Sequence, residues 1–152
     1  MAGRNAKIAV DMRNWSDESR RSMAAEFAGP VYVDQALSCR RCDREFVFSA
    51  QRQKEIFEVR KAYIWQRPVL CPQCWPLRLQ WVTELKSLRA RWSSQRAVMK
   101  RDVEALWRWR RVLDELTACG LRRDKAQIAM LDKLLIRAAA DSDDSGLTKS
   151  SV

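Results

Sequence analysis

Two pairs of cysteines at C-x2-C spacing constrain the fold of this 152-residue chain more than any other feature. The pairs are Cys39 with Cys42 and Cys71 with Cys74, and histidine is absent. Two such turns can place four thiolates around one ion at Zn–S distances of about 2.3 Å. Because four thiolates leave no open coordination position, the sequence predicts one structural Zn²⁺ rather than a catalytic metal.

Two other interpretations of these cysteines have less support from the sequence. A thioredoxin-like redox centre needs a single C-x-x-C at a strand-to-helix turn of a parallel α/β fold. An iron–sulfur cluster also accepts four thiolates. Ligand type and spacing favour zinc. The fifth cysteine, Cys119, lies outside both pairs, and we expect it to be a small apolar residue at a helix end.

The first residues and the hydropathy of the chain bear on its location. Residues 1–10 contain no apolar stretch long enough for a signal peptide, and the chain has no run of about 18 apolar residues. We therefore expect a cytoplasmic protein without a membrane partner. Structural disulfides are rare in that compartment, which again favours metal binding.

The residues around the first cysteine pair predict a β-hairpin. Residues 37–42 and Glu45–Phe48 are β-prone and flank Asp43-Arg44. Asp43 suits the turn because aspartate tolerates left-handed backbone geometry.

Helices are expected after the hairpin and at the second pair. Ser49 can cap a helix over residues 50–62. Three residues would share its apolar face: Ile56, Val59 and Tyr63. Cys74-Trp75-Pro76 opens another helix, with Pro76 well placed in the first turn. A second cysteine pair at a helix start is typical of treble-clef zinc folds.

Residues 32–79 also resemble a known family. The matching motifs are Tyr32-Val33-Asp34, Leu37-Ser38-Cys39-Arg40-Arg41-Cys42, Phe46-Val47-Phe48-Ser49-Ala50, Gln53, Pro68 and Cys71-Pro72-Gln73-Cys74. They are similar to those of the bacterial probable zinc-ribbon family, a treble-clef-like group. The resemblance implies that the four cysteines are the ligands. It implies no established reaction.

The chain departs from the family pattern at three places. Family members often have Gly, Gly-Glu and Arg where this chain has Asp43, Gln51-Arg52 and Trp75. None of these changes removes a metal ligand.

The second half of the chain is predicted to be helical. Residues 77–119 contain neither proline nor glycine, so the sequence predicts one helix of roughly 42 residues, about 63 Å long. Apolar residues recur at spacings of four and three, as in a coiled-coil seam. The seam comprises Trp81, Leu85, Leu88, Trp92, Met99, Leu106, Trp109, Leu113 and Leu116. Gln95 and Asp102 interrupt it.

A helical hairpin is expected at the end of this long helix. Gly120 is a natural terminator, and Asp124 with Gln127 fits a capping box for a second helix to about residue 140. Its apolar face, Ile128, Leu131 and Leu135, should meet the end of the long helix in antiparallel packing. The first part of the seam, residues 81–92, should instead pack on the zinc-binding head or on its helix.

These elements give a small α+β zinc-binding domain (zinc ribbon or treble-clef-like) followed by a long α-helix and a helical hairpin, mainly α overall. The expected organisation is a partly disordered N-terminal extension (1–30), a four-cysteine zinc domain (31–79), a coiled-coil-like helical region (80–140) and a disordered tail (141–152). One helix is expected within the extension, over residues 16–27.

The charge indicates an anionic partner. Lys and Arg number 29 and Asp and Glu 19, a formal net charge of +10. Candidate nucleic-acid contacts are Arg40, Arg41, Arg96, Lys100, Arg101, Trp107, Arg108, Arg110 and Arg111. The alternative is that Trp107 packs under the returning helix and that the arginines form a solvated face.

The sequence therefore favours a non-enzymatic zinc protein that binds nucleic acid or a ribonucleoprotein. The alternative is a protein–protein adaptor that recruits a partner or a second copy through the long helix. An enzyme with a small-molecule substrate is disfavoured, because the chain has no histidine and no glycine-rich phosphate loop.

Overall fold

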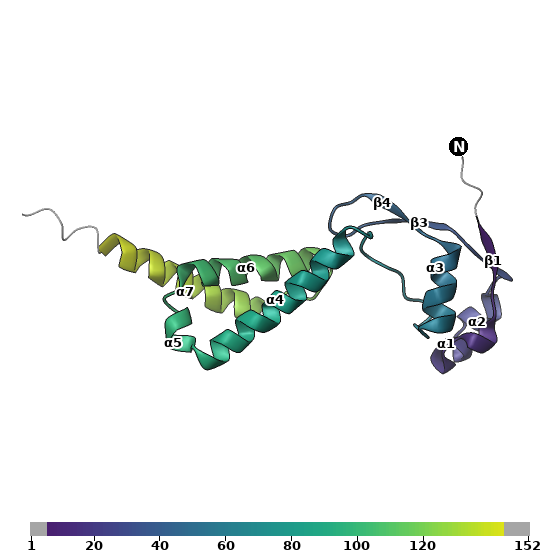
Figure 1. Cartoon of the computed structure of the whole chain (residues 1–152), viewed down its shortest axis with the longest axis horizontal. Helices are drawn as coiled ribbons and strands as arrows, with labels where there is room; N and C mark the ends of the chain where they lie inside the picture. The colour runs from purple at the N-terminus through teal and green to yellow at the C-terminus, as the bar shows by residue number, and fades with distance from the viewer. Residues whose placement is uncertain (1–5, 145–152) are drawn as a thin grey trace, which may run out of the picture. The chain divides into compact units, whose positions relative to one another are not determined.

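The computed structural model of the chain describes residues 6–144. The chain forms two compact units, residues 1–72 and 73–152. Among the described residues, the strands all lie in the first unit and the second unit is helical (Figure 1). Helix dominates overall, as expected. None of the helices in residues 6–144 combines the length and apolarity needed to cross a membrane.

The first unit contains two small antiparallel sheets and several short helices. Strands β1 (Lys7–Ala9) and β2 (Val31–Val33) form one sheet, and β3 (Gln35–Ser38) and β4 (Glu45–Phe48) form the other. The helical segments are η1 (Met12–Asn14), α1 (Asp17–Arg21), α2 (Ala24–Phe27), α3 (Ala50–Lys54) and the π-helical η2 (Glu55–Val59).

The expected hairpin is confirmed, but its first strand is Gln35–Ser38 rather than residues 37–42. Gln35 pairs with Phe48 and Ser38 with Glu45, so the first cysteine pair lies in the turn that follows β3. Asp43 has φ 60°, in the left-handed region, as its place in the turn requires.

The helix after β4 begins as expected and ends earlier. The Ser49 hydroxyl accepts a hydrogen bond from the Arg52 amide at 3.1 Å and caps α3. The helix widens into the π-turn η2 and ends at Val59, whereas we expected it to reach Ala62. The π-turn shifts the buried face, so that Phe57 is buried and Val59 is exposed.

Residues 6–30 differ from the partly disordered extension that we expected. They form β1, η1, α1 and α2, and Trp15 and Ala24 belong to one core with Tyr32, Phe48 and Phe57. The single helix expected over residues 16–27 is two helices, α1 and α2. Residues 1–5 lie outside the described residues.

A buried polar network attaches this N-terminal segment to η2. Glu58 accepts hydrogen bonds from the Asp11 amide (2.9 Å), the Tyr32 hydroxyl (3.0 Å) and Lys54 Nζ (2.8 Å). The Tyr32 hydroxyl in turn accepts one from Trp15 Nε1 at 2.7 Å. Burial raises the pKa of Glu58, but these donors outweigh it and hold that pKa below its ordinary value. The carboxylate is therefore charged and fully partnered inside the unit.

The long helix expected over residues 77–119 is instead three helices. They are α4 (Cys74–Ser94), α5 (Arg96–Met99) and α6 (Val103–Ala118), and α4 and α6 pack against each other (Figure 1). The chain leaves helical geometry at Gln95, with φ −133° and ψ 40°. Asp102 then begins α6 as its N-cap, because Oδ1 accepts the Ala105 amide at 3.0 Å.

This fold-back buries the apolar seam within the second unit. Leu85 and Leu88 of α4 share one core with Leu106 and Trp109 of α6. The rings of Trp92 and Trp109 lie edge to face, with centroids 5.6 Å apart. The expectation that residues 81–92 pack on the zinc-binding head is therefore wrong, since their partners come from their own unit.

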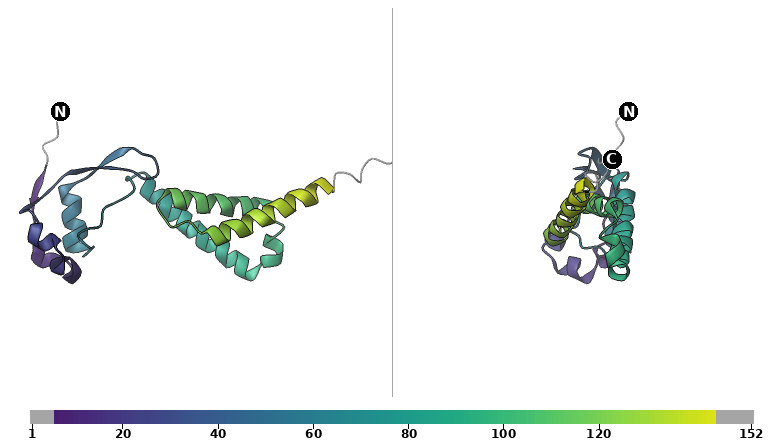
Figure 2. Two further views of the ribbon diagram at one scale, coloured as in Figure 1. Left: turned by 180° about the vertical axis from the view of Figure 1, so that it is seen from behind. Right: turned by 90° about the vertical axis from the view of Figure 1, so that its left-hand side faces the viewer.

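The expected hairpin of α6 and α7 (Lys125–Asp144) is confirmed, and Figure 2 shows the two helices side by side. Gly120 has φ 98°, and the Leu121 amide donates to the Leu116 carbonyl at 3.0 Å, which closes α6. Asp124 Oδ1 accepts the Gln127 amide at 3.0 Å, one half of a capping box.

The apolar face expected on the last helix is also confirmed, and the helix runs further than expected. Ile128, Leu131 and Leu135 of α7 lie in the core shared with α6. Helix α7 continues to Asp144, so residues 141–144 of the expected tail are helical. Residues 145–152 lie outside the described residues.

Candidate metal centre

The first cysteine pair is shaped by the turn that follows β3. The Cys39 carbonyl accepts the Asp43 amide at 2.9 Å, and the Cys39 amide donates to the Arg44 carbonyl at 2.9 Å. These bonds fold residues 39–44 into a tight knuckle, which the left-handed Asp43 allows. Cys39 and Cys42 are thereby brought together.

The second cysteine pair reaches the same place from the other end of the domain. The Arg40 amide donates to the Val69 carbonyl at 2.8 Å, which ties the chain before Cys71 to the first knuckle. Cys74 is the first residue of α4. A helix N-terminus favours an anionic sulfur, because its amides point toward the ligand and its dipole is positive.

The four sulfurs form one compact cluster. The Sγ atoms of Cys39, Cys42, Cys71 and Cys74 all lie within 4.8 Å of one another. A tetrahedron with Zn–S bonds of about 2.3 Å has S–S edges of about 3.8 Å, and the Cys42 and Cys71 sulfurs are 3.8 Å apart. Three of the cysteines are buried and Cys42 is half-buried.

The electrostatics of the cluster favour thiolates. Burial raises the pKa of Cys39, but the backbone amides of Cys71, Cys42 and Arg41, together with the Cys42 thiol, lower it to about 6. A thiolate held by amide donors at neutral pH is ready to bind a soft or borderline metal ion.

This donor set fits the predicted structural zinc. Four sulfurs satisfy tetrahedral Zn²⁺ and leave no position for water or substrate. Bound zinc would join the β3–β4 hairpin to the start of α4, and so supply folding free energy rather than reactivity.

Cys119 is not part of the cluster. It is buried at the C-cap of α6, where its amide donates to the Glu115 carbonyl at 2.9 Å. This is the helix-end position expected from the sequence.

The structure separates the candidate nucleic-acid contacts into two groups. Arg108 and Arg110 hold helices together. The Arg108 guanidinium pairs with Glu84 of α4 and lies 5.1 Å from the Trp81 ring centroid, and Arg110 pairs with Asp132 of α7 at 3.0 Å.

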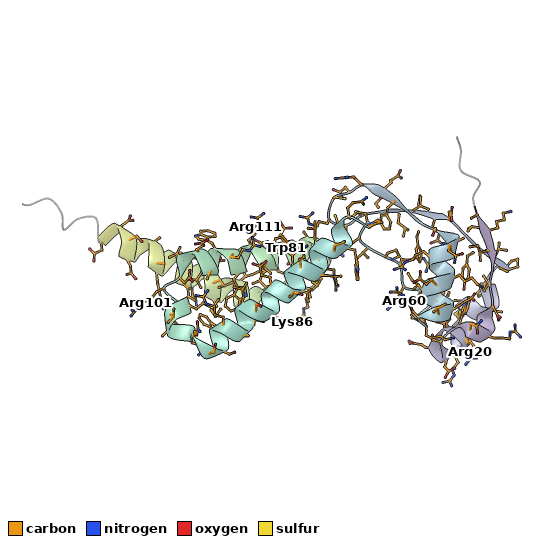
Figure 3. All side chains as sticks on the ribbon, viewed as in Figure 1. Arg20, Arg60, Trp81, Lys86, Arg101 and Arg111 are labelled. Atoms are coloured by element: carbon orange, nitrogen blue, oxygen red, sulfur yellow. The ribbon has the colours of Figure 1, made fainter. Side chains whose placement is uncertain are left out.

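Of the remaining candidates, Trp107 and Arg111 lie on the outer face of α6. Trp107 is 60% exposed, so it does not pack under the returning helix. Figure 3 shows Arg111 projecting away from the helical unit. Arg40 is exposed on the zinc knuckle and Arg41 is half-buried.

Three candidates lie at the break between α4 and α6, which we call the basic elbow (residues 95–101). Arg96, Lys100 and Arg101 are all exposed there, and the elbow contains no acidic residue. The Arg96 guanidinium lies 5.3 Å from the Trp92 ring centroid. Among residues 6–144, no carboxylate forms an ion pair with these three side chains. Arg101 is labelled at this end of the unit in Figure 3.

Comparison with known proteins identifies the zinc-binding part. Residues 33–80 match the family model described as "Probable treble clef domain". The matched stretch contains all four clustered cysteines and agrees with the resemblance noted over residues 32–79. No curated protein and no solved structure matches the chain.

Proposed function

We propose that this treble clef protein is a non-enzymatic, cytoplasmic binder of nucleic acid or of a ribonucleoprotein. Zinc stabilises the treble clef domain, and the helical unit contacts phosphates through the basic elbow. One observation carries the proposal. The apolar seam of the helices is buried within their own unit, while the basic side chains between α4 and α6 are exposed and pair with no carboxylate of residues 6–144.

The charges around the elbow support phosphate binding. Arg96, Lys100 and Arg101 fall within six consecutive residues. The nearest acid, Asp102, is engaged by Arg91 Nη2 at 2.7 Å and by the Ala105 amide, so it does not neutralise them. Stacking on Trp92 orients Arg96 and leaves its outward donors available.

We narrow the proposed set of contact residues on the same grounds. Arg108 and Arg110 are left out of the primary contacts, because helix-joining carboxylates hold their guanidinium groups. Trp107 and Arg111 stay as secondary contacts, because Glu104 lies on the same exposed face of α6 and weakens its attraction for phosphate. Arg40 and Arg41 on the zinc knuckle stay as further candidate contacts of the first unit.

The alternative function, a protein–protein adaptor, has less support from the helical unit. That alternative needs an exposed apolar seam along the helix, but Leu85 and Leu88 of the seam are buried in the core of the helical unit. A four-thiolate centre has no open position for catalysis, so no reaction is proposed.

A salt-series binding assay tests the proposal. Fluorescence anisotropy of labelled single-stranded RNA and duplex DNA is measured from about 50 to about 300 mM salt. Three phosphate contacts predict a slope of log K against log salt of about −2 to −3. The variant carrying Arg96→Glu, Lys100→Glu and Arg101→Glu should lose most of the affinity and the slope.

The matched control reverses the same number of positive charges elsewhere on the helical unit. Lys86, Lys133 and Arg137 are exposed on α4 and α7, and Lys86 is labelled in Figure 3. Reversing these three charges should lower affinity only slightly, through the long-range field. If the elbow variant binds with wild-type affinity and slope, or if the control loses as much, the elbow is not the contact surface.

A further inference from the structure

A second candidate binding site belongs to the first unit, whereas the basic elbow belongs to the second. A cavity of about 240 Å³ opens beside β2 and is lined mainly by apolar residues. Phe27 and Trp65 border it and are 76% and 57% exposed. Val31 and Val33, also in the lining, are exposed large apolar residues. Exposed apolar side chains gathered around one cavity indicate a binding surface.

Among the described residues, Arg67 is the one charged side chain that lines this cavity. Its guanidinium lies 5.7 Å from the Phe57 ring centroid, and its Nη1 donates to the Ile64 and Gln66 carbonyls at 2.8 and 2.9 Å. No carboxylate within residues 6–144 forms an ion pair with it. Arg67 is therefore a positioned cation that lacks an anionic partner.

The edge of β2 that faces away from β1 is open at Val31, whereas the Val33 carbonyl on that edge accepts a hydrogen bond from Gln53 Nε2 at 2.6 Å. The Val10 amide donates to the Pro30 carbonyl at 3.0 Å, and Ile8 pairs with Tyr32. Hydrogen-bonded pairs alternate along an antiparallel ladder, so Val31 lies between them and directs its N–H and C=O away from β1. In the described part of the chain, β1 is the only strand that pairs with β2. An extended chain can add to this edge.

The size of the cavity points to a peptide side chain. Sites for whole small molecules or cofactors measure about 300–1,000 Å³, whereas this cavity has room for about one large side chain. A nucleic acid is a poor fit, because an apolar lining with one cation offers few phosphate contacts.

We propose that this groove binds an extended acidic segment of a partner protein. The segment adds as a strand along β2, inserts one aromatic or large aliphatic side chain into the cavity, and places a neighbouring Asp or Glu carboxylate on Arg67. This groove shares no residue with the proposed nucleic-acid contacts, so an experiment can refute one proposal without affecting the other.

Peptide selection tests the inference. A display library of random seven-residue peptides is selected against the zinc-loaded full chain, and enriched sequences are synthesised with a fluorescent label. They should combine an aromatic or large aliphatic residue with a nearby Asp or Glu. Methylating the backbone amides that would pair with β2 should abolish binding, whereas methylating the alternate amides should not, because only one set faces the strand.

Two substitutions locate the site, and a third is the control. Arg67→Gln removes the cation and should weaken binding at least tenfold. Phe27→Ala should also weaken it, and because Phe27 is largely exposed the core is not disturbed. Arg21→Gln removes an exposed arginine of α1 that does not line the cavity, and binding should be unchanged. Zinc content and far-UV circular dichroism confirm that each variant is folded.

Several results would overturn the inference. They are the absence of any enriched peptide, enrichment of sequences without acidic residues, unchanged affinity in Arg67→Gln, or an oligonucleotide that competes with the peptide for this groove.

Discussion

The contact between Trp92 and Trp109 offers a sharp test of the fold-back. The two residues are 17 positions apart, so in one continuous helix they would lie about 26 Å from each other. In the folded unit their rings meet edge to face at 5.6 Å. Such an aromatic pair stabilises a fold by about 0.5–1.5 kcal/mol in addition to the free energy gained from burying its surface. A double-mutant cycle should therefore show coupling of that size.

The cycle uses Trp92→Leu, Trp109→Leu and the double variant. Trp109 is 1% exposed, so Trp109→Leu should destabilise strongly, though by less than the about 3–5 kcal/mol of a Trp→Ala change. Trp92 is only partly buried, so Trp92→Leu should lower the free energy of unfolding by less than Trp109→Leu does. Unfolding free energies come from urea titrations followed by circular dichroism at constant zinc. Coupling indistinguishable from zero would refute the packing of α4 on α6.

Three further predictions concern single positions. Glu58→Gln should destabilise by about 1–2 kcal/mol, since the charge-assisted bond from Lys54 is lost. The pKa of Glu58 in the folded protein lies below its ordinary 4.5. The difference in unfolding free energy between the wild type and Glu58→Gln should therefore be constant from about pH 7 to about pH 5 and shrink as the pH falls further. Urea titrations at each pH would measure it. Gly120→Ala should cost about 1 kcal/mol in the same urea assay, because φ is 98° there. Cys119→Ala should leave the zinc content unchanged in metal analysis, and loss of metal would show that the ligand set is wrong.

Local signals predicted much of the zinc-binding part. The spacing of the four cysteines is sufficient to predict their convergence, because each C-x2-C turn is a short local structure. Asp43 and Ser49 were also predictable, since a left-handed turn and a helix N-cap depend on the residue itself and its immediate neighbours.

The break in the long helix was harder to predict. Residues 77–119 contain no proline or glycine, and most of them are good helix formers. Tertiary packing decides the outcome, because folding back buries Leu88 against α6. One signal was present. Asp102 is a preferred N-cap residue, and its interruption of the seam also marks the start of α6.

The N-terminal segment depends on contacts distant in sequence. Trp15, Tyr32 and Glu58 meet through hydrogen bonds between residues 17 and 26 positions apart. No periodic pattern in residues 6–30 indicates such partners. The exposed arginines pose the same difficulty, since sequence could not distinguish Arg110, which joins two helices, from Lys100, which faces solvent.

Native mass spectrometry of the reduced, intact protein is the most direct test of the zinc centre on which the fold of residues 33–80 depends. We expect one zinc ion per chain, and a metal-free, partly unfolded chain in the Cys71→Ser variant, because the metal supplies much of the folding free energy of such a domain. A metal-free native protein with a disulfide between Cys39 and Cys42, or a protein that carries iron and sulfide, would contradict the structural zinc site.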